Sequence, residues 1–320
     1  MTIQRIQQRT LEYDPAPERV VALVNPASGI GTGQRVIDVL RQRHWPADVT
    51  VFATSPDLTG HRAALDYARA TYADRLIVAG GDGTLMETLT EMLSTGPAIP
   101  ICMLPIGTGN IVANDLDMPR RILPALRQAF RTGWRRWWDI GHLEPSGQFF
   151  ALRASTGHEA ATLANMDPAT KKRLGTLAYA MPAVRELIKA EPVTFTLTID
   201  DLPPVQLQGI TAFVAATSRM VNWVDFVLSR DIAPDDGVLH AGVVHPQKLL
   251  ANLPHMVGSA ALEARDIVTT FPVKHRVRID ADPPQRCQVD GECLEQNTPL
   301  VVNNYPGKAA FITPLRMRKR

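Results

Sequence analysis

Three glycine-rich segments of the sequence have the composition of phosphate-binding loops. They cover residues 25–33 (NPASGIGTG), 80–84 (GGDGT) and 105–110 (PIGTGN), and each follows a short apolar run. Glycine lets a ligand approach backbone N–H groups closely, and such groups in front of a helix form a site for anions. One such loop would be weak evidence, because turns between strands and helices often contain glycine. Three in succession predict a ligand that carries several phosphates.

Asp82 stands in the middle of the second segment, where a carboxylate would repel phosphate. A magnesium ion between the phosphates and the carboxylate removes that repulsion. Aspartate is also favoured at helix N-caps, but the glycines on both sides favour the binding interpretation. The sequence has no Gly-x-x-x-x-Gly-Lys-[Ser/Thr] segment, and GIGTG lacks the third glycine of a dinucleotide fingerprint.

A second pair of carboxylates, Asp290 and Glu292, flanks Gly291 in the segment VDGE. If this segment is extended, both side chains point to the same face. A carboxylate beside an acceptor hydroxyl can take its proton during phosphoryl transfer. A hairpin turn is the alternative interpretation, and the residues by themselves favour it.

The elements that position these residues change in pattern along the chain. Apolar, strand-like runs at residues 19–25, 48–54, 75–80 and 99–105 alternate with helical patterns at 57–72 and 85–93. Such alternation predicts an α/β domain with a doubly wound parallel sheet. Ligands of these sheets bind beyond the carboxyl ends of the strands, where the three glycine segments are expected.

After about residue 138 the pattern becomes that of short strands. Residues 194–200 alternate strictly, and 206–217, 240–244, 274–280 and 299–302 are further strand-like runs, with one helical pattern at 246–257. This predicts a second domain of antiparallel strands, similar to a β-sandwich.

Composition limits the function classes. The chain has 320 residues, 45% of them hydrophobic, and a net charge of +2, which does not indicate nucleic-acid binding. Its three cysteines have no metal-site spacing and fit a reducing compartment. No secretory signal and no membrane-spanning run is apparent, so a cytoplasmic protein with at most peripheral membrane contact is expected. The basic residues 316–320 are either a solvated terminus or a contact to anionic lipid headgroups.

Several segments together resemble the diacylglycerol kinase catalytic domain family, which includes bacterial soluble lipid kinases and the sphingosine and ceramide kinases. The matching segments are VNPASGIGTG, GGDGTLMETL, LPIGTGNIVANDLDMP, APDDGVLHAGVV and CQVDGECL, in the right order over nearly the whole chain. The resemblance implies an ATP-binding α/β domain at residues 1–138 and a β-rich lipid-binding domain at 139–305. It also implies that residues 306–320 return to the first domain and that phosphoryl transfer takes place between the domains.

The resemblance also implies roles for individual residues, with ATP and Mg²⁺ as cofactors and a membrane lipid as substrate. Asp290 matches the proton acceptor for the lipid hydroxyl, while Glu292 and Asp82 match carboxylates of the magnesium network. Ala233, Asp236 and Val238 match a structural metal site. The implied nucleotide contacts are Asn25, Ser28, Gly29, Thr54, Gly80, Gly81, Asp82, Gly83, Thr84, Gly107, Thr108 and Asn110.

The sequence departs from the family pattern at Met86, where asparagine is common, and at Ile111, where many bacterial members have aspartate. His158 and Glu159 also replace common residues near the implied lipid cleft. Two other functions stay open at this point: a kinase of a soluble acceptor, as NAD kinase is, and a nucleotide or lipid sensor without catalysis. The acceptor lipid and the oligomeric state, a homodimer included, are also left open.

Overall fold

The computed structural model describes residues 11–158, 191–218, 232–245 and 268–315. The chain divides into two compact units, Met1–Asp139 with Pro306–Arg320, and Ile140–Tyr305. The helix expected at 246–257 lies outside the described residues. Among the described helices, none is both long and apolar enough to span a bilayer.

The first unit is built on a parallel sheet with strand order β5-β4-β2-β3, as the alternating pattern predicted. Both middle strands are buried apart from the first residue of one, because helices cover both faces of the sheet. Beyond β5, the sheet continues in parallel with the end of β17 (Leu300–Pro314), where Phe311 pairs with Ile101. The parallel strands are β2 (Arg19–Val24), β3 (Asp48–Ala53), β4 (Arg75–Gly80) and β5 (Ile101–Pro105).

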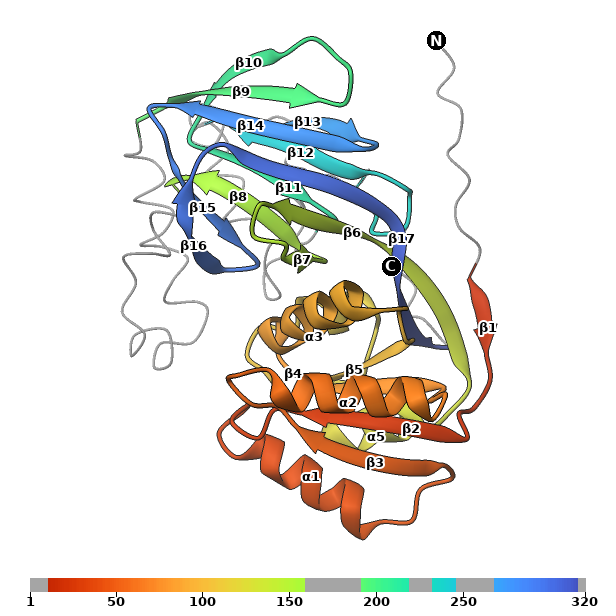
Figure 1. The fold of residues 1–320 in the computed structure, drawn as a ribbon. Coiled ribbons are helices and arrows are strands. Elements are labelled where there is room, and N and C mark those ends of the chain that lie inside the picture. The colour runs from red at the N-terminus through yellow and green to blue at the C-terminus, as the bar shows by residue number, and fades with distance from the viewer. Residues whose placement is uncertain (1–10, 159–190, 219–231, 246–267, 316–320) are drawn as a thin grey trace, which may run out of the picture. The chain divides into compact units, whose positions relative to one another are not determined.

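The helices of this unit lie on both faces of the sheet. The crossover through α1 (Thr32–Gln42) leads from β2 outward to β3, whereas α2 (Thr59–Ala70) and α3 (Asp82–Thr95) lead in the opposite direction. Because such crossovers are right-handed, this reversal puts α1 on the face opposite to α2 and α3, as Figure 1 shows. The loops after β2 and β4 therefore start from neighbouring strands at the point of reversal, where ligands of such sheets bind.

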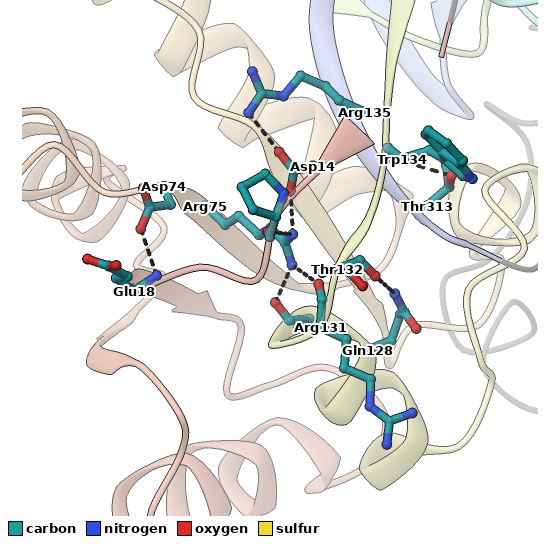
Figure 2. Close-up of polar contacts among 12 residues, drawn as sticks. Asp14, Glu18, Asp74, Arg75, Gln128, Arg131, Thr132, Trp134, Arg135 and Thr313 are labelled. Atoms are coloured by element: carbon teal, nitrogen blue, oxygen red, sulfur yellow. Dashed lines mark hydrogen bonds and ion pairs between the residues drawn. The ribbon is translucent and has the colours of Figure 1, made fainter. Parts of the chain in front are cut away.

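A buried arginine connects neighbouring elements at the amino end of β4, opposite to the glycine loops. Arg75, the first residue of β4, is fully buried and pairs with Asp14 of β1 (Glu12–Asp14), with 2.7 Å between Nε and Oδ2. Its guanidinium also donates to the carbonyls of Ala129, at the end of α5 (Ile122–Ala129), and Arg131. Asp14 is shared with Arg135 of β6 (Gly133–Glu144), 2.7 Å away (Figure 2). One network of ion pairs and hydrogen bonds therefore joins β1, β4, α5 and β6.

The second unit consists of antiparallel strands, as the sequence predicted. One sheet has the order β13-β12-β11-β8-β15-β16, and a second group has the order β10-β9-β14-β17 (Figure 1). Phe195, Leu197 and Ile199 alternate with less buried threonines along β9, because one face of that strand packs into the core. The strands are β7 (Phe149–Phe150), β8 (Arg153–Gly157), β9 (Val193–Ile199), β10 (Val205–Gly209), β11 (Thr211–Ala215), β12 (Leu239–Val244), β13 (Val268–Val273), β14 (Arg276–Asp282), β15 (Arg286–Val289) and β16 (Glu292–Asn297).

Two long strands contain the junctions between the units. The first junction falls between Asp139 and Ile140 within β6, and the second between Tyr305 and Pro306 within β17. The boundaries expected from the sequence were 138/139 and 305/306. β17 pairs with β14 before its junction and with β5 after it.

Candidate functional site

Asp82 links the second glycine loop to the third. It is the first residue of α3, and its carboxylate accepts hydrogen bonds from the N–H groups of Ile111 (3.0 Å) and Val112 (3.2 Å). These two residues begin the short helix α4 (Ile111–Asp115), whose first N–H groups have no partner within the helix. Burial raises the pKa of the Asp82 carboxyl above its ordinary value, against the lowering effect of these N–H groups. Asp82 therefore caps the start of α4 in the way an N-cap carboxylate does. Ile111, which departs from the family pattern, contacts Asp82 through its backbone N–H.

The second and third loops also touch through bare backbone. The N–H groups of Ile106 and Gly107 donate to the carbonyl of Gly80, at 3.1 and 3.2 Å. A Cβ on Gly107 would lie 2.4 Å from the Cα of Gly81, closer than real side chains approach. Asn110, with a left-handed φ of 56°, folds the third loop onto itself by bonding both backbone groups of Gly107.

The first loop joins this group through Asn25, which follows β2. Its backbone N–H donates to the carbonyl of Ala79 (2.8 Å), and its side-chain amide donates to the hydroxyl of Thr84 (3.0 Å). A Cβ on Gly29 would lie 2.4 Å from the carbonyl oxygen of Ile106 in the third loop. All three glycine loops therefore meet at the carboxyl ends of β2, β4 and β5.

The remaining predicted nucleotide residues of the first unit lie in or beside these loops. Thr54 directly follows β3, is half-buried and donates its N–H to the carbonyl of Val24 (2.9 Å). Met86, the other family departure, is buried in α3. Among the loop residues, Ser28, Gly80 and Thr84 are half-buried or buried, while Gly29, Gly83 and Thr108 are exposed.

Asp290 forms a hairpin turn in the second unit. Asp290 (φ 47°) and Gly291 (φ 88°) are both left-handed and connect β15 to β16, so the segment forms the hairpin turn that the residues by themselves favour and is not extended. Aspartate followed by glycine suits a two-residue turn that needs two positive φ angles. The Asp290 carboxylate accepts the N–H of Arg153 (2.7 Å), and its own N–H donates back to the Arg153 carbonyl (2.8 Å). Glu292 is exposed at the start of β16, outside the turn.

Asp236, the carboxylate of the expected structural metal site, has protein partners on both oxygens. One accepts the N–H of Val238 (3.1 Å), and the other lies 3.2 Å from Nε2 of His240. In the described part of the chain, no three His, Cys, Asp or Glu side chains form a group that could hold a metal ion. The expected site has one carboxylate, that of Asp236, and its other oxygen ligands would be the backbone carbonyls of Ala233 and Val238. This site stays a prediction.

Two residues beside the Asp290 turn were not singled out from the sequence. Gln288 is 1% exposed and Ser155 is fully buried, and they lie opposite one another on β15 and β8. The only signal in the sequence is one glutamine in the strand segment RCQV, which does not identify a partner.

The chain is similar to known proteins over both of its units. A model of the diacylglycerol kinase catalytic domain matches residues 19–143, and a model of the YegS C-terminal NAD kinase beta sandwich-like domain matches residues 153–313. The diacylglycerol kinase of Mycobacterium tuberculosis (strain ATCC 25618 / H37Rv) is 30% identical over 262 residues, 79% of this chain and 82% of that protein. The diacylglycerol kinase of Bacillus subtilis (strain 168) is 24% identical over 283 residues, 86% of this chain and 90% of that protein. A crystal structure of a diacylglycerol kinase from Bacillus anthracis str. Sterne shares the fold with a TM-score of 0.67 and 17% identity, covering 93% of this chain and 97% of that chain.

Proposed function

The chain belongs to the diacylglycerol kinase catalytic domain family, and from this membership we propose a lipid kinase that depends on ATP and magnesium. The proposed reaction transfers the γ-phosphoryl group of ATP to the hydroxyl group of a lipid. The observation that supports this most is the meeting of three glycine loops at one edge of the parallel sheet, held by Asp82 and Asn25.

The glycine loops are proposed to hold the phosphates of ATP. Gly81 and Gly107 contact each other through bare backbone, which brings the second and third loops together so that both can offer N–H groups to the same phosphates. The carboxylate of Asp82 and the exposed loop residues Gly83 and Thr108 would surround the phosphates. Magnesium, when bound beside Asp82, would neutralise the negative charge that phosphoryl transfer concentrates there.

Asp290 is proposed to take the proton of the lipid hydroxyl. Its carboxylate is held by the backbone N–H of Arg153, so its direction is fixed before any substrate binds. A carboxylate in a defined position can align the hydroxyl and accept its proton as the phosphorus–oxygen bond forms. Glu292 is proposed to be a carboxylate of the magnesium network, as the resemblance implies.

The test is phosphorylation of defined acceptors by the purified protein. We would supply radiolabelled ATP and Mg²⁺ with mixed micelles of diacylglycerol, with micelles of a sphingoid base, with NAD, or without an acceptor. We expect label in a lipid product that is identified by chromatography and mass spectrometry, and its loss when Mg²⁺ is removed.

Two results would overturn the proposal. Label in a soluble product would favour a kinase of a soluble acceptor. Binding of ATP, measured by calorimetry, without turnover on any acceptor would favour a nucleotide sensor.

A further inference from the structure

Gln288 is a buried polar side chain that makes two directed hydrogen bonds. It lies on β15, two residues before Asp290, and is 1% exposed. Its Oε1 accepts the N–H of Gly291 (2.8 Å), and its Nε2 donates to the hydroxyl of Ser155. Because an N–H group can only donate, the bond to Gly291 fixes which end of the amide points into the turn. The remaining end must then point at Ser155.

These bonds attach the Asp290 turn to strand β8 at a second point. The first point is Arg153, which exchanges two hydrogen bonds with Asp290. The second is Ser155, two residues further along β8 and directly opposite Gln288. The turn is therefore held on the Asp290 side by Arg153 and on the Gly291 side by Gln288.

The glutamine satisfies two polar groups around the turn. An apolar side chain of similar size would leave the Gly291 N–H and the Ser155 hydroxyl without this partner, and leaving a buried polar group unsatisfied lowers stability. Aspartate tolerates the left-handed φ of 47° at Asp290, so the bonds of Gln288 act on the Gly291 side of a turn that the local sequence already favours.

We propose that Gln288 is a positioning residue for phosphoryl transfer. Anchored by Ser155, its amide holds the N–H of Gly291 and so keeps the carboxylate of Asp290 in one direction. The inference rests on the proposed function, in which Asp290 accepts the proton of the lipid hydroxyl. A displacement of about 1 Å at such a group can cost about 100-fold in rate.

The test compares four variants with the unsubstituted protein on detergent-dispersed lipid. Gln288→Met keeps the volume and removes both hydrogen bonds, and Ser155→Ala removes only the anchor. Gln288→Glu keeps an acceptor for Gly291, while the Ser155 hydroxyl can rotate to donate to it. Thr156→Val is the matched control, because Thr156 is equally buried on β8 and bonds the Arg286 carbonyl (2.8 Å) instead of the turn.

We expect Gln288→Met to lower kcat by about 10- to 100-fold while the Kd of ATP stays unchanged. Ser155→Ala should lower kcat less, Gln288→Glu should recover most of it, and Thr156→Val should lower the melting temperature with kcat unchanged. If Gln288→Met does not fold, the other two variants provide the test. A kcat of Ser155→Ala that is lower than that of Gln288→Glu supports the proposal, and the reverse order overturns it.

The outcomes separate this inference from the proposed function. Lipid turnover that is sensitive to Asp290→Asn but insensitive to Gln288→Met overturns the positioning role alone. Equal losses of kcat in Thr156→Val and Gln288→Met would also overturn it, since burial by itself would then explain the effect. Absence of lipid turnover in the unsubstituted protein overturns both.

Discussion

At the scale of single residues, the two carboxylates of the proposed reaction have different surroundings. Asp82 is bonded by the N–H groups of Ile111 and Val112, which begin helix α4 of the same unit. Asp290 is bonded by the N–H of Arg153, which lies on a neighbouring strand of the second unit. Replacing each by asparagine should therefore produce different defects.

We predict that Asp290→Asn lowers kcat by about 10²- to 10⁴-fold, the typical contribution of a positioned base, with little change in ATP affinity. The asparagine carbonyl can still accept the N–H of Arg153, so the turn should persist. Asp82→Asn should weaken ATP binding as well as turnover, because its amide N–H₂ group must face one of two donors. Calorimetry and steady-state rates on both variants distinguish these patterns. Near-normal lipid phosphorylation by Asp290→Asn would show that VDGE is only a turn.

Gly81 and Gly107 contact each other, and substituting each glycine separately should have different effects. Gly81 has an ordinary φ of −97°, and a Cβ on it would meet only the Cα of Gly107 at 3.4 Å. A Cβ on Gly107 would instead collide with the Cα of Gly81 at 2.4 Å.

We predict that Gly81→Ala keeps the melting temperature nearly unchanged but weakens ATP binding about tenfold or more, because its methyl group blocks the approach to the loop. Gly107→Ala should lower the free energy of unfolding by about 1–3 kcal/mol, the usual cost of overpacking. Thermal melts and ATP calorimetry measure both effects. Unchanged ATP affinity in folded Gly81→Ala would count decisively against phosphate binding at this loop.

At the scale of elements, the carboxylate of Asp57, two residues before α2, has a lowered pKa. Hydrogen bonds from the hydroxyls of Ser55 and Thr59, and from the Thr59 N–H, lower the pKa of Asp57 from 3.8 to about 2. The ionised form is therefore favoured in the folded state. Its contribution to stability is fully present above the unfolded value and is lost as the pH falls through about 4 to about 2.

We predict that the unsubstituted protein loses more stability than Asp57→Asn between pH about 4 and about 2, because asparagine has no charge to lose there. Urea unfolding of both proteins at several pH values measures the difference. Parallel curves over this range would contradict the assigned cause. Asp280→Asn is a control on another element, because Asp280 is half-buried and pairs with Arg278 instead of with hydroxyl groups.

Among the ion pairs described in the first unit, the pair of Arg75 with Asp14 should contribute most to stability. Asp14 is 2% exposed, so removing Arg75 leaves this carboxylate buried with Arg135 as its charged partner among the described residues (Figure 2). We predict that Arg75→Met lowers the free energy of unfolding by about 3–5 kcal/mol, the cost of breaking a buried pair.

Arg278→Met is the matched control, because its pair with Asp280 is half-exposed and should contribute at most about 1 kcal/mol. Adding Asp14→Asn to Arg75→Met should recover part of the loss, since the uncompensated charge is then removed. Denaturant unfolding would refute the prediction if the Arg75 and Arg278 variants were equally stable.

At the scale of the whole molecule, residues 316–320 determine the sign of the net charge of a nearly neutral chain. Four of these five residues are basic, so deleting them turns the net charge of +2 negative. The last described residue before them, Leu315, accepts a hydrogen bond from the indole of Trp134 (3.3 Å).

We predict that deleting residues 316–320 weakens binding to anionic vesicles, because each basic residue near such a surface contributes about 1 kcal/mol. The difference should fade with salt, since screening shortens the reach of charge to about 10 Å at 0.1 M. Turnover on detergent-dispersed lipid should be unchanged. Vesicle sedimentation at low salt measures the effect, and equal binding by both forms would rule it out.

The sequence by itself determined the classes of element and the position of the loops. Apolar runs between helical patterns predicted the parallel sheet, and strict alternation such as that of residues 194–200 predicted the antiparallel one. These features could be predicted because burial and strand geometry leave a local periodicity in the chain. The glycine loops at the carboxyl ends of the strands followed from the same reasoning.

Only the tertiary structure decided which groups meet. Asp82 bonds residues 29 and 30 positions away, and Gln288 bonds Ser155 at a separation of 133. The Asp290 turn, which a local Asp-Gly signal favours, acquires its partner Arg153 only because β8 pairs with β15. A hydrogen bond depends on which strands become neighbours, and strand pairing is a property of the folded chain that local spacing does not contain.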